Sequence, residues 1–154
     1  MKPMLSIALA ATLLAGAAHA QVTVKDAWVR ATVPQQKATG AFMHLHALSS
    51  SRLVAVSSPL TPHVEVHEMS MDGDIMRMRP VKVLDLPAGK AVELKPGGYH
   101  VMLLNLKEQV REGDTVPLTL VFESKDGKTE SVKVMAPVRA LAASTRPASG
   151  HGHP

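Results

Sequence analysis

The sequence predicts an all-β fold, a single β-sandwich of roughly seven to nine strands. Turn signals rich in Gly, Pro, Asp and Ser recur along the chain, and short stretches of β-branched or alternating apolar residues lie between them. Short strands spaced by about 8–12 residues are typical of sandwiches and barrels. After residue 20, no stretch keeps the i, i+3, i+4, i+7 apolar spacing of a helix.

Turn signals separate the predicted strands from one another. The turns are residues 39–40, 49–51, 59–62, 72–74, 87–89, 96–98, 112–114 and 126–128. The predicted strands, in order, are residues 22–24, 41–47, 53–56, 64–66, 75–83, 92–94, 100–106, 116–122 and 131–135. The aromatic residues Trp28, Phe42, Tyr99 and Phe122 are expected in the core or at its rim.

Residues 1–20 are predicted to be a secretory signal peptide. Lys2 is followed by an apolar run over residues 5–15 and by the small-residue site Ala18-His19-Ala20. The run is too short for a spanning helix of about 20 apolar residues. We therefore expect an exported, periplasmic protein without membrane insertion, with one folded domain at 21–139. Residues 140–154, rich in Ala, Ser, Pro and Gly, are predicted to be a flexible tail.

The composition excludes several kinds of chemistry. The chain has 9 Met and 8 His but no Cys. Disulfides, thiolate zinc sites, iron–sulfur clusters, thiol nucleophiles, blue-copper centres and a lipid anchor on cysteine all need a cysteine sulfur. Lys and Arg do not cluster with aromatic residues, which argues against nucleic-acid binding. No nucleophile elbow, P-loop or dinucleotide motif is present, so we expect no enzyme activity.

Histidine and methionine share a spacing in two places, His67-x-Met69 and His100-x-Met102. Residues i and i+2 of a strand point to one face, about 6.6 Å apart, so both side chains can reach one ion. Thioethers select Cu(I), and imidazole also binds copper. Met78 lies nearby in sequence, and spacing alone leaves Met69 and Met78 as rivals for one coordination position.

The remaining methionines and histidines have simpler interpretations. Taken singly, Met69, Met71, Met76 and Met135 are expected to be core fillers. As an alternative, the first three form a soft collar that admits a partner's copper site. His44, His46 and His63 are expected at the surface. His151 and His153 offer a secondary Cu(II) site in the tail. The alternative is that this end of the chain is solvated and has no role in binding.

The spacing of His67, Met78 and His100-x-Met102 resembles the pattern of the periplasmic copper chaperones called PCuAC. The segments 66–68, 76–80, 94–100 and 102–106 are similar to that family too. The resemblance implies a cupredoxin-like β-sandwich that binds Cu(I) through His67, Met78, His100 and Met102. It also implies delivery toward the copper A site of cytochrome c oxidase, whose copper-bearing subunit is the expected partner, with a Sco-type thiol copper protein as a further one. We expect a monomer.

Two alternatives to a copper chaperone remain open. One is an exported β-sandwich binding or assembly module that holds no metal and whose methionines belong to the core. The other is a periplasmic copper buffer with no dedicated recipient. Binding of Cu(I) separates the chaperone from the module, and transfer to an oxidase copper domain separates it from the buffer.

Overall fold

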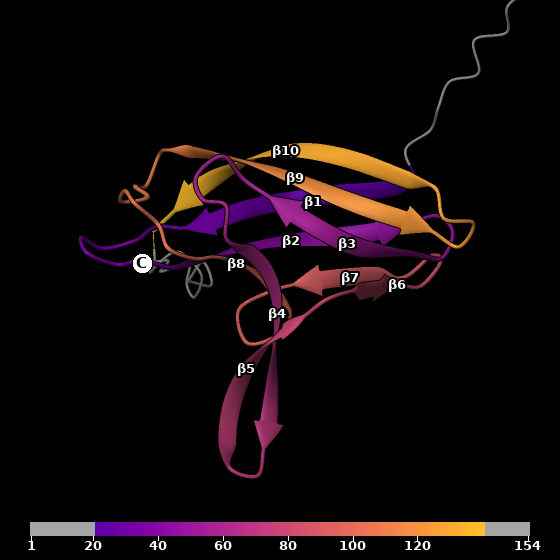
Figure 1. The fold of residues 1–154 in the computed structure, drawn as a ribbon, viewed down its shortest axis with the longest axis horizontal. Coiled ribbons are helices and arrows are strands. Elements are labelled where there is room, and N and C mark those ends of the chain that lie inside the picture. The colour runs from indigo at the N-terminus through magenta and orange to yellow at the C-terminus, as the bar shows by residue number, and fades with distance from the viewer. Residues whose placement is uncertain (1–20, 141–154) are drawn as a thin grey trace, which may run out of the picture.

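Ten strands make up the computed structural model, which describes residues 21–140 (Figure 1). They are β1 (Val22–Arg30), β2 (Thr39–Ala47), β3 (Ser51–Ser57), β4 (Val64–Asp72), β5 (Ile75–Val81), β6 (Leu84–Leu86), β7 (Ala91–Leu94), β8 (His100–Leu103), β9 (Thr115–Ser124) and β10 (Thr129–Arg139). Within this described part, no helix is long and apolar enough to cross a membrane. The prediction of an all-β fold is confirmed.

The strands form two layers that share one parallel contact. The hydrogen-bonded order is β5-β4-β8-β2-β1-β10-β9-β3-β6, and β7 also pairs with β2. Val29 and Arg30 of β1 pair with Val138 and Arg139 of β10, which joins the layer containing β2 to the layer containing β9. Because side chains alternate along each strand, both layers turn one apolar face inward.

The core lies between the layers and is built from these inward positions. Met43 and Leu45 of β2 are buried against a cluster that includes Leu120 and Phe122 of β9. Their neighbours on β2, Phe42 and the exposed His44, belong to the outward face. The apolar residues whose alternation predicted the strands are therefore also the residues that form the core.

Several strands differ from the prediction, among them β8, which ends at Leu103, and β10, which runs from Thr129 to Arg139. The expected strand at 75–83 ends at Val81, and a separate short strand, β6, follows. β1 continues to Arg30 through a bulge between Lys25 and Trp28, where Asp26 has a φ of 54°. The bulge interrupts the alternation, so the sequence signal stops at Val24 although the strand does not. β4 extends beyond Val66 to Asp72 because it pairs with β5.

The β4–β5 hairpin projects away from the sandwich (Figure 1). β4 pairs with β8 only over the residues from Val64 to His67, whereas its pairing with β5 continues to Asp72. The connecting turn contains Gly73 with a φ of 64°, a conformation that favours glycine. Beyond His67 the hairpin is thus a two-stranded ribbon.

Candidate metal site

The strand register brings the two histidines to the base of the hairpin. His67 of β4 lies directly opposite His100 of β8. One step toward the sandwich on the same strands, Glu65 lies opposite Met102. One step toward the hairpin tip, Met69 lies opposite Met78 of β5. Residues two apart in a strand share a face, so all of these side chains belong to one face.

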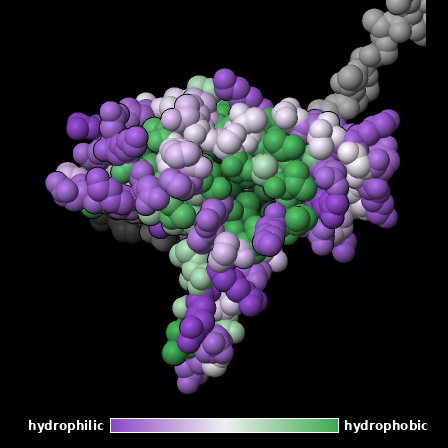
Figure 2. All heavy atoms as spheres, in the orientation of Figure 1, coloured by the Kyte–Doolittle hydropathy of each residue, from purple (hydrophilic) through white to green (hydrophobic). Residues whose placement is uncertain are grey.

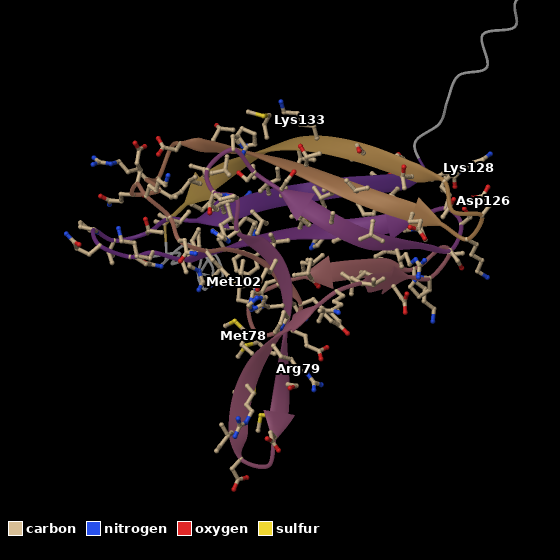
Figure 3. All side chains as sticks on the ribbon, in the orientation of Figure 1. Met78, Arg79, Met102, Asp126, Lys128 and Lys133 are labelled. Carbon is tan, nitrogen blue, oxygen red and sulfur yellow. The ribbon has the colours of Figure 1, made fainter. Side chains whose placement is uncertain are left out.

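Figure 3 shows Met78 and Met102 near each other where the hairpin leaves the sandwich, whereas Arg79 points to the other side of the hairpin. The structure therefore brings together His67, Met78, His100 and Met102, the four residues carried over from the family pattern. It also places Met69 beside them, so the register does not separate the two rival methionines.

The spacing of the imidazole rings suits a shared ion. The ring centroids of His67 and His100 are 6.0 Å apart. An imidazole nitrogen binds a metal at about 2.0 Å, which places a ring centroid about 3 Å from the ion. Two rings that share one ion thus have centroids at most about 6 Å apart. The observed separation lies at this limit, so the two rings are within range of one shared ion.

One nitrogen of each ring is held by a hydrogen bond, which leaves the other available. His100 Nδ1 donates to the carbonyl oxygen of Gly98 at 2.9 Å. His67 Nε2 lies 2.7 Å from the Glu65 carboxylate, and its Nδ1 is buried without a hydrogen-bond partner. Since a carbonyl and a carboxylate can only accept, each bonded nitrogen carries the proton. The lone pairs then lie on His100 Nε2 and His67 Nδ1.

This arrangement is typical of histidines that bind metal. Metal-ligating histidines usually donate their second N–H to a carbonyl or carboxylate, which fixes the ring and its tautomer. A buried nitrogen without a partner, such as His67 Nδ1, costs free energy until something binds it. The residues present therefore fit a soft cation.

A hollow of about 290 Å³ opens beside these residues. Its walls include three of the four family-pattern residues together with Met69; the lining is Arg30, Gln36, Ala38, Thr39, Gly40, Phe42, Met69, Met78, Pro96, Gly97, His100 and Met102. Thioethers and an imidazole thus share one partly enclosed space. Among residues 21–140, no group of three or more His, Asp or Glu side chains is placed to hold a metal ion.

Phe42 supports the site from β2. Its ring centroid lies 6.4 Å from that of His100 and 4.7 Å from that of Trp28. Gly40, which pairs with Met102, makes room for the ring: a Cβ atom there would lie 2.8 Å from Phe42 Cζ. His100 is accordingly only 5% exposed.

The other face of the hairpin is ionic. Arg79 Nε donates to Glu68 at 2.9 Å. Burial, followed by the charge of Glu68 and a hydrogen bond to it, raises the pKa of Tyr99. Since Glu68 alternates with His67 and Met69 along β4, Tyr99 lies beside the hairpin face opposite the one that carries His67 and Met69.

The remaining histidines lie apart from this site. His44 is exposed and forms ion-pair contacts with Asp26 at 3.4 Å and Glu93 at 3.2 Å. His46 is half-buried and His63 is exposed. His151 and His153 lie outside the described residues, as do the signal peptide at 1–20 and residues 141–154 of the tail. Those assignments stay predictions.

The expectation that single methionines fill the core was wrong for most of them. Met71 is 62% exposed, Met76 49% and Met135 58%. Of the methionines within residues 21–140, only Met43 belongs to the buried hydrophobic cluster. Met71 and Met76 lie on a hairpin face beyond the sandwich, and Met135 is adjacent to the buried Ala136 and so faces outward.

Two residues that orient the histidines, Glu65 and Gly98, were not predicted from the sequence. Glu65 was detectable, because a residue two positions before His67 shares its face in a strand. The carbonyl of Gly98 carried no comparable signal, since any residue supplies a backbone oxygen.

The two-layer fold and the site define a cupredoxin-like β-sandwich of the PCuAC type, so the resemblance seen in the sequence is confirmed. The chain belongs to the LpqE-like family. The family model, described as "Putative lipoprotein LpqE-like", matches residues 22–138.

Two curated relatives and two solved structures illustrate this membership. "Putative lipoprotein Lxx21020" of Leifsonia xyli subsp. xyli is 30% identical over 114 residues, covering 73% of this chain and 68% of the relative. "Uncharacterized protein RP573" of Rickettsia prowazekii is 30% identical over 123 residues, with 76% and 68% covered. The copper-bound PCuAC domain from PmoF2 has a TM-score of 0.64 at 26% identity, covering 79% and 94%. The Cu(I) form of DR1885 from Deinococcus radiodurans has a TM-score of 0.60 at 34% identity, covering 81% and 83%.

Proposed function

We propose that this protein is an exported Cu(I) chaperone that binds its cargo through His67, Met78, His100 and Met102. One observation carries the proposal: two paired imidazoles each keep one nitrogen free for a metal, and thioethers lie beside them on the same face. The copper-bound PCuAC neighbours and the Cu(I) form of DR1885 support this assignment.

The ligand set suits a cargo that must be held and released. Thioethers and neutral imidazoles carry no charge, so Cu(I) keeps its single positive charge when bound. Soft ligands favour Cu(I) over harder ions. Met78 is 49% exposed, whereas His100 is 5% exposed. A partner's ligand can therefore displace Met78 first, while His100 holds the ion until the exchange is complete.

Proton competition follows from the same ligands. Imidazole must be neutral to bind, so protons compete with copper at His67 and His100 but not at the methionines. Copper affinity is therefore expected to fall as the pH drops from 7.5 to 5. A competition titration checks this, and a constant affinity over that range would contradict histidine ligation.

The physiological role extends the binding proposal. The family description and the Leifsonia relative both name lipoproteins, which supports export, and we place the protein in the periplasm on the predicted signal peptide. The proposed recipient is the copper-bearing subunit of cytochrome c oxidase at its copper A site, with a Sco-type thiol protein as a second partner. His151 and His153 are proposed as a separate Cu(II) site.

The decisive experiment is anaerobic Cu(I) titration followed by X-ray absorption spectroscopy. One tightly bound ion with mixed nitrogen and sulfur ligation is expected. His67→Ala and Met78→Leu should weaken this binding, whereas His63→Ala, at an exposed position, should not. Ligation by nitrogen and oxygen alone would refute the site.

The two alternatives predict different results. A sandwich module without metal would bind no stoichiometric Cu(I), and its methionines would be core residues, which Met71 and Met76 are not. A copper buffer would bind the ion but would not transfer it to an oxidase copper domain. Transfer measured between the purified proteins therefore separates the chaperone from the buffer.

A further inference from the structure

The hairpin beyond His67 carries an exposed column of thioethers. Met69 lies directly opposite Met78, and Met71 lies directly opposite Met76. Met71, Met76 and Met78 are 62%, 49% and 49% exposed. We call these four residues the methionine ladder. It lies on the same face as the two histidines and begins one step above them.

General hydrophobicity does not explain the ladder. The opposite face of the hairpin carries ion pairs between Arg77 and Asp72 at 3.0 Å and between Arg79 and Glu68 at 2.9 Å, with one exposed apolar residue, Ile75, beside the turn. In Figure 2, hydrophilic and hydrophobic surface lie side by side on the projecting hairpin. A fully solvated ribbon gains little from large apolar side chains, because no second layer covers them. Methionine at each ladder position therefore requires another reason.

Thioether chemistry supplies that reason. Directly opposed residues of an antiparallel pair have Cβ atoms about 4.5–5.5 Å apart. Methionine has three rotatable bonds and a polarizable sulfur, so two opposed sulfurs can meet on one ion. A sulfur–metal bond of about 2.3 Å allows two ligating sulfurs to lie up to about 4.6 Å apart. Cu(I) is the biological ion that such soft ligands select.

We propose that the outer pair, Met71 and Met76, binds a second, weaker Cu(I) and that the ladder passes it to the histidine site. Successive rungs are about 6.6 Å apart along the strands. An ion on the outer pair moves inward when Met69 and Met78 replace Met71 and Met76, and His67 and His100 then replace Met69. Copper stays Cu(I) throughout, since each step exchanges one neutral ligand for another. The inference rests on the proposed function of the inner site, by which we mean the copper site formed by His67, Met78, His100 and Met102.

The test counts copper ions on the full-length protein. Anaerobic Cu(I) titration with native mass spectrometry should find two bound ions, the second at least tenfold weaker than the first. The double variant Met71→Leu/Met76→Leu keeps side chains of similar size and should lose only the second ion. Met135→Leu, at an equally exposed position on β10, is the matched control and should keep both.

Methyl NMR of the methionines gives a second readout that does not depend on stoichiometry. The Met71 and Met76 resonances should shift only after the first equivalent of Cu(I) has been added. Release of the inner ion to a chelator should be about tenfold slower in the double variant. A wild-type protein that binds a single ion, or a double variant that still binds two, would overturn the ladder site.

A failure of the proposed function can be distinguished from a failure of the ladder proposal. If His100→Ala leaves the tight ion in place, the proposed function fails, whatever happens at the ladder. If His100→Ala removes the tight ion and the double variant changes nothing, only the ladder proposal fails. Leucine keeps the apolar surface of the hairpin, so a defect in the double variant reports lost ligands rather than lost apolar contact.

Discussion

The sandwich and the β4–β5 hairpin use the same alternation of side chains with opposite results. In the sandwich, alternation on β2 and β9 directs Met43 and Phe122 into the core. On the hairpin it directs Met71 and Met76 into solvent, because no second layer lies over that face. An apolar residue on a strand therefore contributes to the core only where a second layer covers its face, and on an uncovered face it remains available for contact with something else.

The largest expected effect separates the two regions by stability. Phe122→Ala, at 1% exposure, should lower the free energy of unfolding by about 3–5 kcal/mol through the cavity it leaves. Met76→Ala, at 49% exposure, should change it by less than about 0.5 kcal/mol. Urea denaturation measures both. Similar losses for the two variants would mean that the hairpin face is covered in solution.

The second prediction concerns copper affinity at the base of the hairpin. Glu65→Leu removes the acceptor that holds His67 Nε2–H and so leaves the ring free to rotate or to change tautomer. Cu(I) affinity should fall about 10–100-fold, as for other residues that orient metal-binding histidines. Competition with a Cu(I) chelator measures the change, and Glu65→Gln, which keeps an accepting oxygen, should restore most of the affinity.

Glu93→Leu is the matched control for Glu65→Leu. Glu93 accepts from His44 at 3.2 Å, so its loss removes the same kind of contact from a histidine that is not a candidate copper ligand. Copper affinity should stay at the wild-type value. An unchanged affinity in Glu65→Leu would show that His67 does not depend on Glu65 for its orientation.

The third prediction tests the contact between the two regions. Gly40→Ala places a Cβ atom 2.8 Å from Phe42 Cζ and must displace the ring that supports His100. Overpacking of this kind costs about 1 kcal/mol or more, and copper affinity should fall severalfold. Gly98→Ala is the control, because its Cβ would meet no atom closer than 3.6 Å. Equal melting temperatures and affinities for both variants would contradict the role assigned to Gly40.

Local pattern predicted most of the strands, and the family resemblance implied the candidate ligand set, but neither predicted the surroundings of these residues. The alternation of Met76, Arg77, Met78 and Arg79 predicted a strand with two unlike faces. It did not predict which face would be covered, because that depends on the pairing of β4 with β8, formed by residues more than 30 positions apart. The same long-range pairing places His67 opposite His100, which the family resemblance implied and spacing alone could not establish.

Features of the backbone also could not be predicted from the sequence. The bulge in β1 depends on the register with β2 and leaves no apolar period in the sequence. The carbonyl of Gly98 orients His100 without involving a side chain. Residues whose contribution comes from the main chain or from an absent Cβ atom, such as Gly98 and Gly40, were therefore recognised only in the structure.

The smallest expected effect concerns Tyr99, which lies beside the ionic face of the hairpin. Burial, with the charge of Glu68 and a hydrogen bond to it, raises the pKa of Tyr99 above its usual value of about 10. The folded protein thus favours the protonated phenol. The resulting stability is fully present below pH 10 and is lost as the pH rises through the folded-state pKa. Tyr99→Phe cannot ionise, so wild type should lose its stability advantage over this variant as the pH rises above 10. Thermal denaturation of the two proteins across that range measures the difference, and lysine titration contributes equally to both. A stability difference that stays constant with pH would show that ionisation of Tyr99 is not coupled to its burial beside Glu68.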